Sequence, residues 1–169
     1  ALLPILALGG VLALADPWVG RAATLAALST FFAIASIVLA RLRPFHPFAS
    51  FGPANLVTLA RGAIVAALFG LLLAPDPLRD QPVAFALAAL ALALDGVDGW
   101  LARRSGMVSR FGARFDMEID ALLILALSAT AWLDGKSGLW VLLIGLMRYV
   151  FVAASHAVPA LAGDLPPSQ

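Results

Sequence analysis

Long apolar runs separated by short polar breaks dominate the chain. A membrane-spanning helix needs about 20 largely apolar residues at a rise of about 1.5 Å each. The runs that approach or reach this length are 2–15, 22–40, 56–74, 83–101, 115–133 and 139–158. The breaks between them contain proline, glycine and charged residues, and no strand-like alternation is visible. The pattern predicts an all-α, polytopic bundle of about six transmembrane helices, of which the first is short.

The composition supports a protein that lies within a membrane. Hydrophobic residues make up 62% of the chain and charged residues 12%, whereas soluble domains have about 45–50% and about 25%. So few charges cannot cover a water-exposed surface, and most of the chain should therefore face lipid. The chain has no cysteine, which excludes disulfides, zinc–thiolate sites and thiol nucleophiles.

The charges are distributed unevenly between the two sets of loops. One set carries Arg41, Arg43, Arg103, Arg104, Arg110 and Arg114. The other set carries Arg21, Arg79 and Lys136 together with Asp16, Asp76, Asp80 and Asp134. The positive-inside rule predicts that the arginine-rich side is cytoplasmic. Trp18, Trp132 and Trp140 flank the opposite side, where interfacial anchors are expected.

Two pairs of aspartates lie near the cytoplasmic ends of the fourth and fifth predicted helices. Acids within a membrane cost about 2.5–3.5 kcal/mol each on insertion scales, so they indicate function. Asp95 and Asp98 are three residues apart and Asp116 and Asp120 are four apart, so each pair shares a helix face. The short turn at 105–106 should make the two helices antiparallel neighbours. Four converging carboxylates need counter-charge, and oxygen-only ligands suit Mg²⁺, Mn²⁺ or Ca²⁺.

Residues around the aspartates suit a group that carries phosphate. Gly99 and Ala102 leave space beside the first pair, and Gly112 does so at the entry to the next helix. Arg103 can reach a phosphate with its forked guanidinium. Cations and an arginine beside a pyrophosphate are the usual equipment for phosphoryl transfer. Glu118 lies on another face of its helix and is expected outside the ligand set.

The same segment resembles the signature of the CDP-alcohol phosphotransferase family. The match is Asp95-x2-Asp98-Gly99-x2-Ala102-Arg103-x8-Gly112-x3-Asp116-x3-Asp120. A chance match of eight specified residues is on the order of 10⁻¹⁰ per starting point. The resemblance implies a membrane enzyme that cleaves the pyrophosphate of a CDP-linked alcohol, releases CMP and passes the phospho-alcohol to an acceptor hydroxyl.

The resemblance also implies roles for individual residues. Two Mg²⁺ (or Mn²⁺) ions would be held by Asp95, Asp98, Asp116 and Asp120, and Asp120 would also be the base that deprotonates the acceptor. The implied CDP contacts are Gly99, Ala102, Arg103, Ser109 and Gly112.

A second stretch, from Pro53 to Arg61, resembles the start of the family's first core helix. Asn55, Thr58 and Arg61 follow one another at three-residue spacing and can share a face towards the nucleotide. An alanine separates Pro53 from Asn55, which departs from the family pattern. Asn55 and Thr58 could alternatively be helix caps.

Three further polar residues lie outside these patterns. Arg148 falls in the middle of the last predicted helix, where an unpaired guanidinium is costly. We expect it to bind the phosphate of the acceptor or a site carboxylate, or else to snorkel or pair with another helix. His46 and His156 lack ligand spacing and are interpreted as structural.

The resemblance implies a domain at residues 43–169, preceded by two extra transmembrane helices at residues 1–42. The family core has six helices, so its last two are expected to be missing here. The expected protein is a homodimeric enzyme of phospholipid biosynthesis in the bacterial cytoplasmic (inner) membrane, with its site facing the cytoplasm and no nucleic-acid partner.

The most strongly expected donor is CDP-diacylglycerol. A CDP-choline or CDP-ethanolamine donor with a diacylglycerol acceptor is the alternative within the family. The sequence from Asp116 to Ala121 lacks the DPxADK pattern that several family members have, so it does not identify the acceptor alcohol. Outside the family, the alternatives are an aspartate-rich membrane prenyltransferase and an ion- or proton-coupled transporter.

Overall fold

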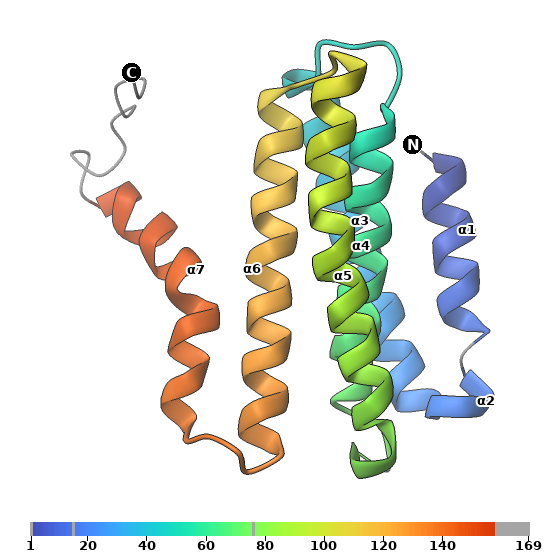
Figure 1. Ribbon diagram of the computed structural model, residues 1–169, viewed down its shortest axis with the longest axis vertical. Coiled ribbons are helices and arrows are strands. Elements are labelled where there is room, and N and C mark those ends of the chain that lie inside the picture. Colours follow the sequence, from blue (N-terminus) through green and yellow to red (C-terminus); the bar gives the residue numbers. More distant parts are fainter. Residues whose placement is uncertain (1, 15, 76, 158–169) are drawn as a thin grey trace.

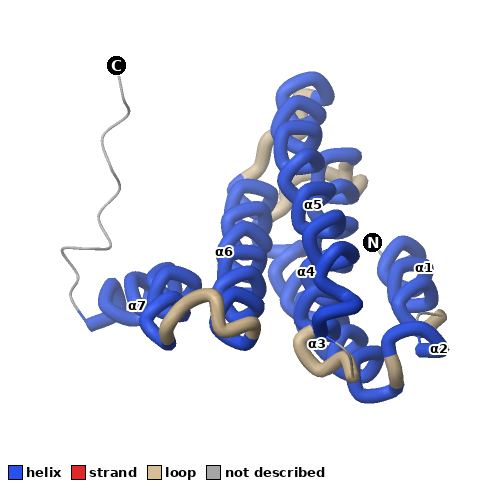
Figure 2. Tube along the Cα trace, turned by 60° about the horizontal axis from the view of Figure 1, so that its bottom comes forward, coloured by secondary structure: helices blue, strands red, loops and turns tan. Residues whose placement is uncertain are grey.

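A computed structural model describes residues 2–14, 16–75 and 77–157, which form helices joined by short loops (Figures 1 and 2). The elements are α1 (Leu2–Ala13), α2 (Asp16–Val19), α3 (Arg21–Phe45), α4 (Pro53–Leu71), α5 (Pro77–Ser105), α6 (Arg110–Leu133), the 3₁₀ turn η1 (Leu139–Val141) and α7 (Leu142–Ala157). The described residues contain no strand, so the predicted all-α fold is confirmed. The short helix α2 was not predicted.

Within the described residues, four segments are long and apolar enough to cross a membrane: Leu2–Val19, Arg21–Leu42, Pro53–Leu71 and Gln81–Ser105. The apolar helix Leu139–Ser155 is shorter. Helix α6 has sufficient length, but its first half carries three acidic residues. The six predicted apolar runs therefore all form helices where the structure describes them, and four meet the criteria for a span by length and composition.

Helix α4 is the central element of the bundle. It packs against α3, α5 and α6, while α1 covers α3 and α4, and α7 packs against α6 (Figure 1). Helices α5 and α6 run in opposite directions, as expected from the short turn between them. Helix α5, however, makes its main contacts with α4, and α6 packs against both α4 and α7, so the two helices contact α4 more than each other. Side chains of α4 can therefore reach both pairs of aspartates.

Two glycines allow neighbouring helices to approach closely. A Cβ atom on Gly70 would lie 2.6 Å from the carbonyl oxygen of Ala23, where α4 crosses α3. A Cβ atom on Gly145 would lie 2.6 Å from the Cα atom of Leu125, where α7 meets α6. Small residues at such crossings are common between membrane helices, because they bring the two backbones together.

The loops 46–52 and 106–109 lie side by side at one end of the bundle, at the top of Figure 1. The side chains of Arg41, Arg103, Arg104, Arg110 and Arg114 belong to this end and are exposed. The side chains of Asp16, Arg43, Asp76, Arg79 and Asp80, which also entered the prediction of orientation, lie outside the described part of the chain.

Candidate functional site

The guanidinium of Arg61 lies at the centre of the four aspartates. Its side chain is 0% exposed, and its nitrogens form ion pairs with carboxylates from two other helices. Nη1 lies 2.8 Å from Asp98 Oδ2 and 2.5 Å from Asp116 Oδ1. Nη2 lies 2.9 Å from Asp95 Oδ1 and also pairs with Asp120. The two aspartate pairs therefore converge, as their spacing predicted, around a cation supplied by α4.

Arg61 belongs to a row of buried polar residues on α4. Asn55, Thr58 and Arg61 are all buried and share one face of the helix, as their three-residue spacing predicted. The hydroxyl of Thr58 donates to Asp98 Oδ2 at 3.0 Å. The amide of Asn55 donates to the carbonyl oxygen of Phe51 at 2.7 Å. The first turn of α4 begins after Gly52 and no side chain caps it, so neither Asn55 nor Thr58 is a helix cap.

The donor set fits a divalent cation. Asp95, Asp98 and Asp116 each offer a carboxylate oxygen, and these three atoms lie within 4.8 Å of one another. All three ligands are oxygens, which Mg²⁺ and Mn²⁺ prefer. The four carboxylates around the single guanidinium of Arg61 leave an excess of negative charge. Asp120 is not one of these three residues, so its carboxylate is the least constrained of the four by binding of such an ion.

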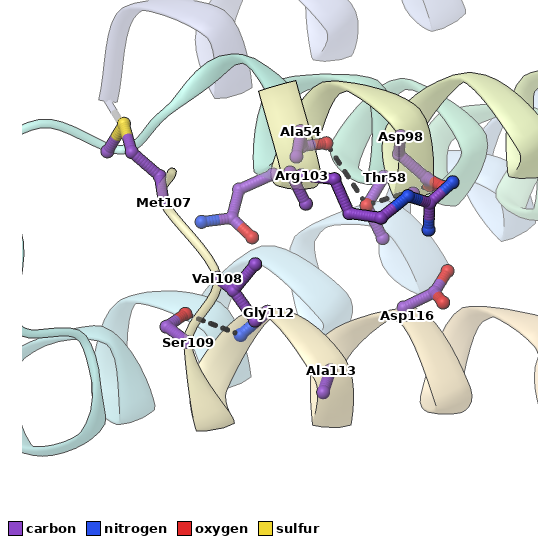
Figure 3. A pocket seen from close by; sticks show the side chains of 13 residues that line it. Ala54, Thr58, Asp98, Arg103, Met107, Val108, Ser109, Gly112, Ala113 and Asp116 are labelled. Carbon is purple, nitrogen blue, oxygen red and sulfur yellow. Dashed lines mark hydrogen bonds between the residues drawn. The ribbon is translucent and has the colours of Figure 1, made fainter. Parts of the chain in front are cut away.

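A cavity of about 210 Å³ opens beside the aspartates (Figure 3). Ligand pockets usually have about 300–1,000 Å³, so this cavity suits part of a large substrate. Its wall contains all but one of the residues that the resemblance implied as CDP contacts: Asn55, Thr58, Gly99, Ala102, Arg103, Ser109 and Gly112. The exception is Arg61. Asp98 and Asp116 also line it, and the side chain of Arg103 extends towards them (Figure 3). The structure thus brings the implied nucleotide contacts and the carboxylates to one place.

Arg61 differs from the expected nucleotide contact because it does not line this cavity. Its guanidinium is directed at the carboxylates, and its Nε atom is buried without a hydrogen-bond partner. The physical reason is the central position of α4, from which a long cationic side chain reaches both aspartate pairs.

Arg148 lies away from the four aspartates. Its Nη2 is 2.5 Å from Glu118 Oε1, so the guanidinium joins α7 to α6. Of the roles considered for Arg148, these contacts favour helix pairing; binding of an acceptor phosphate stays a prediction. Glu118 lies outside the aspartate cluster, as its place on the helix predicted.

Sequence reasoning missed several residues at the rim of the cavity. Ala54, Met107, Val108 and Ala113 line it but carry no chemical signal in the sequence. His46, interpreted as structural, lies 3.3 Å from the hydroxyl of Ser109, a residue of the cavity wall. The side chain of His156 lies outside the described part of the chain.

The comparison with protein families is consistent with this geometry. The model of the CDP-alcohol phosphatidyltransferase family matches residues 51–168. The match covers more than half of the chain and includes α4, α5, α6 and α7, the helices that carry the cluster and the cavity. No solved structure matches the chain.

Proposed function

Because the chain belongs to the CDP-alcohol phosphatidyltransferase family, we propose that it transfers a phosphatidyl group from CDP-diacylglycerol to an acceptor alcohol and releases CMP. Family membership makes it a membrane transferase of CDP-linked alcohols. The single observation that supports the site is the convergence of four carboxylates beside a cavity that contains the implied nucleotide contacts. We further propose a homodimer in the bacterial cytoplasmic membrane, with the arginine-rich end of the bundle in the cytoplasm.

The proposed reaction exchanges one bond to phosphorus for another. The oxygen of the acceptor alcohol bonds to the lipid-linked phosphorus of the donor. The bond from that phosphorus to the oxygen bridging the two phosphates breaks, and CMP leaves with this oxygen. The proton of the acceptor hydroxyl passes to a carboxylate, for which Asp120 is the best candidate because it is partly exposed and outside the three-oxygen cluster.

Other residues of the site would bind and orient the donor. Asp95, Asp98 and Asp116 would hold the divalent cations that the family uses, with Asp120 as a further ligand. Such ions, when bound, polarise phosphoryl oxygens and neutralise charge that develops on them. Arg103 would bind a phosphate of the donor, since its exposed guanidinium extends along the cavity wall (Figure 3). Thr58 holds the carboxylate of Asp98 in place.

A lipid substrate would approach the site from the surrounding membrane. Helix α5, which carries Asp95 and Asp98, exposes Leu92, Val97 and Trp100. Large apolar side chains on this surface are expected to face acyl chains. All four aspartates lie in the halves of α5 and α6 that adjoin the loop 106–109, which favours a substrate site over the relay of acids that a transporter would need.

The choice of donor is tested by measuring CMP release from purified protein in lipid vesicles with Mg²⁺. CDP-diacylglycerol with a panel of acceptor alcohols is compared with CDP-choline and CDP-ethanolamine, each supplied with diacylglycerol. We expect CMP only with CDP-diacylglycerol. Release of CMP only with the CDP-headgroup donors would establish the alternative. If folded protein released no CMP from any of these donors, the proposed transfer would be wrong.

Replacing Gly112 with Ala should weaken donor binding. A Cβ atom at this position would lie 3.0 Å from Asn55 Oδ1 and 3.3 Å from Ser109 Oγ, so both cavity residues would have to shift. We expect the KM for the donor to rise about tenfold, as for loss of one to two hydrogen bonds. Gly96→Ala is the matched control, since its Cβ would meet no atom within 4 Å. Equal donor KM values in the two variants would contradict the proposed role of this wall.

A further inference from the structure

His46 connects the loop before α4 to the first turn of α6. Its backbone N–H donates to the carbonyl oxygen of Leu42 at 2.9 Å, at the end of α3. Its ring lies edge-on to Phe48 and Phe111, with centroid distances of 5.4 and 5.7 Å. These contacts hold the imidazole in one orientation, with its two nitrogens directed at different partners.

The two ring nitrogens have partners of different chemistry. Nε2 lies 2.8 Å from the carbonyl oxygen of Ser50. A carbonyl oxygen can only accept, so Nε2 carries the hydrogen, and Nδ1 of the neutral ring is left as an acceptor. Nδ1 lies 3.3 Å from the hydroxyl oxygen of Ser109. The hydroxyl of Ser109 therefore donates its hydrogen to His46.

The same hydroxyl also accepts a hydrogen bond. The backbone N–H of Gly112 donates to Ser109 Oγ at 3.0 Å, which caps the first turn of α6 (Figure 3). A serine hydroxyl has one hydrogen and two lone pairs. With the hydrogen directed to His46 and one lone pair to Gly112, one lone pair is left for the cavity that Ser109 lines.

We propose that His46 is a positioning residue that makes Ser109 a hydrogen-bond acceptor towards the bound nucleotide. This inference rests on the proposed function, in which the cavity receives the cytidine nucleotide. Ser109 then recognises an N–H or O–H group of that nucleotide, from the base amino group or a ribose hydroxyl. It does not donate to a phosphate oxygen, because its only hydrogen is already used.

Two substitutions of His46 separate this role from general support of the loop. In His46→Asn, the side-chain oxygen of the new amide would stand near the place of Nδ1 and can accept from Ser109. In His46→Gln, the longer side chain would place its amide near the position of Nε2, where it can donate to Ser50 but leaves Ser109 without its acceptor. A purely structural role of the loop would predict that the second variant, which keeps the Ser50 contact, is the milder one.

The test measures binding of CMP by equilibrium dialysis, and kinetics of CMP release from CDP-diacylglycerol, with the intact protein in lipid vesicles. We expect His46→Asn to keep the Kd for CMP within about twofold of the unsubstituted protein. His46→Gln and Ser109→Ala should each raise it about threefold to tenfold. The combined variant His46→Gln/Ser109→Ala should bind no more weakly than Ser109→Ala alone, because both changes remove the same interaction.

The outcomes separate the two proposals. Unchanged CMP binding in His46→Gln, an effect of His46→Asn as large as that of His46→Gln, or multiplying effects in the combined variant would each overturn the role of His46. Absence of CMP binding by the unsubstituted protein would overturn it as well. CMP binding that follows the expected order, together with no CMP release from any donor, would support the role of His46 and refute the proposed transfer.

Discussion

Replacing Asp116 with Asn should reduce metal-dependent CMP release by about a hundredfold or more, while the protein still inserts and folds. Asp116 contributes one of the three clustered carboxylate oxygens and also lines the cavity, so the change removes charge at the place where the donor phosphates would lie. Asn keeps the size of the side chain. Asp95→Asn should act in the same way. The measurement is the rate of CMP release against Mg²⁺ concentration.

Asp134→Asn is the matched control for this experiment. Asp134 ends the same helix on the opposite side of the bundle, where it accepts hydrogen bonds from Gln81 and Lys136 at 3.0 Å each. The same chemical change there should leave CMP release within about twofold, since Asp134 belongs neither to the carboxylate cluster nor to the wall of the cavity. Retained activity in Asp116→Asn, or an equal loss in Asp134→Asn, would refute the assignment of the metal site.

Replacing Arg61 with Met should lower the thermal midpoint in the absence of divalent metal by about 5–10 °C. The change leaves four carboxylates without their shared counter-ion, and one of them, Asp98, is buried. Removing one partner of a buried ion pair costs about 3–5 kcal/mol. The other carboxylates are more than a third exposed, so we expect a loss near the lower end, about 3 kcal/mol.

Mg²⁺ or Mn²⁺ should restore much of the stability lost in Arg61→Met. A cation that binds the folded state alone stabilises it in proportion to the logarithm of its concentration over Kd. Without Arg61 the carboxylates have no competing cation, so the metal-induced rise in the midpoint should exceed that of the unsubstituted protein. Arg148→Met is the control, because it removes an ion pair with Glu118 that lies apart from the aspartates. A rise in Arg61→Met no larger than in the control would contradict a metal site at this cluster.

The sequence predicted the helix face on which Arg61 lies, but not the residues that this face contacts. Its spacing from Asn55 and Thr58 correctly placed the three residues on one helix face, because helical periodicity is local. That face was expected to meet the nucleotide. Spacing does not reveal which helices flank the face, and the packing of α4 against both α5 and α6 directs the guanidinium at the aspartates instead.

The contacts of Arg148 with Glu118 and of His46 with Ser109 also depend on tertiary packing. Glu118 was expected to lie apart from the aspartates and Arg148 to need a partner, yet only the packing of α7 on α6 joins the two. His46 and Ser109 are 63 positions apart, and a lone histidine in a loop carries no signal of a partner. Contacts of this kind depend on how helices and loops are arranged, which local sequence patterns do not specify.

The helical fold, the pairs of aspartates that share a helix face and the class of reaction could all be predicted from the sequence. These follow from apolar run length, from the helical repeat and from a motif contained in 26 consecutive residues, 95–120, all of which are local properties of the chain. Only helix packing places α4 at the centre of the bundle, pairs Arg61 with the four carboxylates and brings His46 to the cavity wall. Those features require residues far apart in sequence to meet, and they meet because the helices bury their faces against particular neighbours.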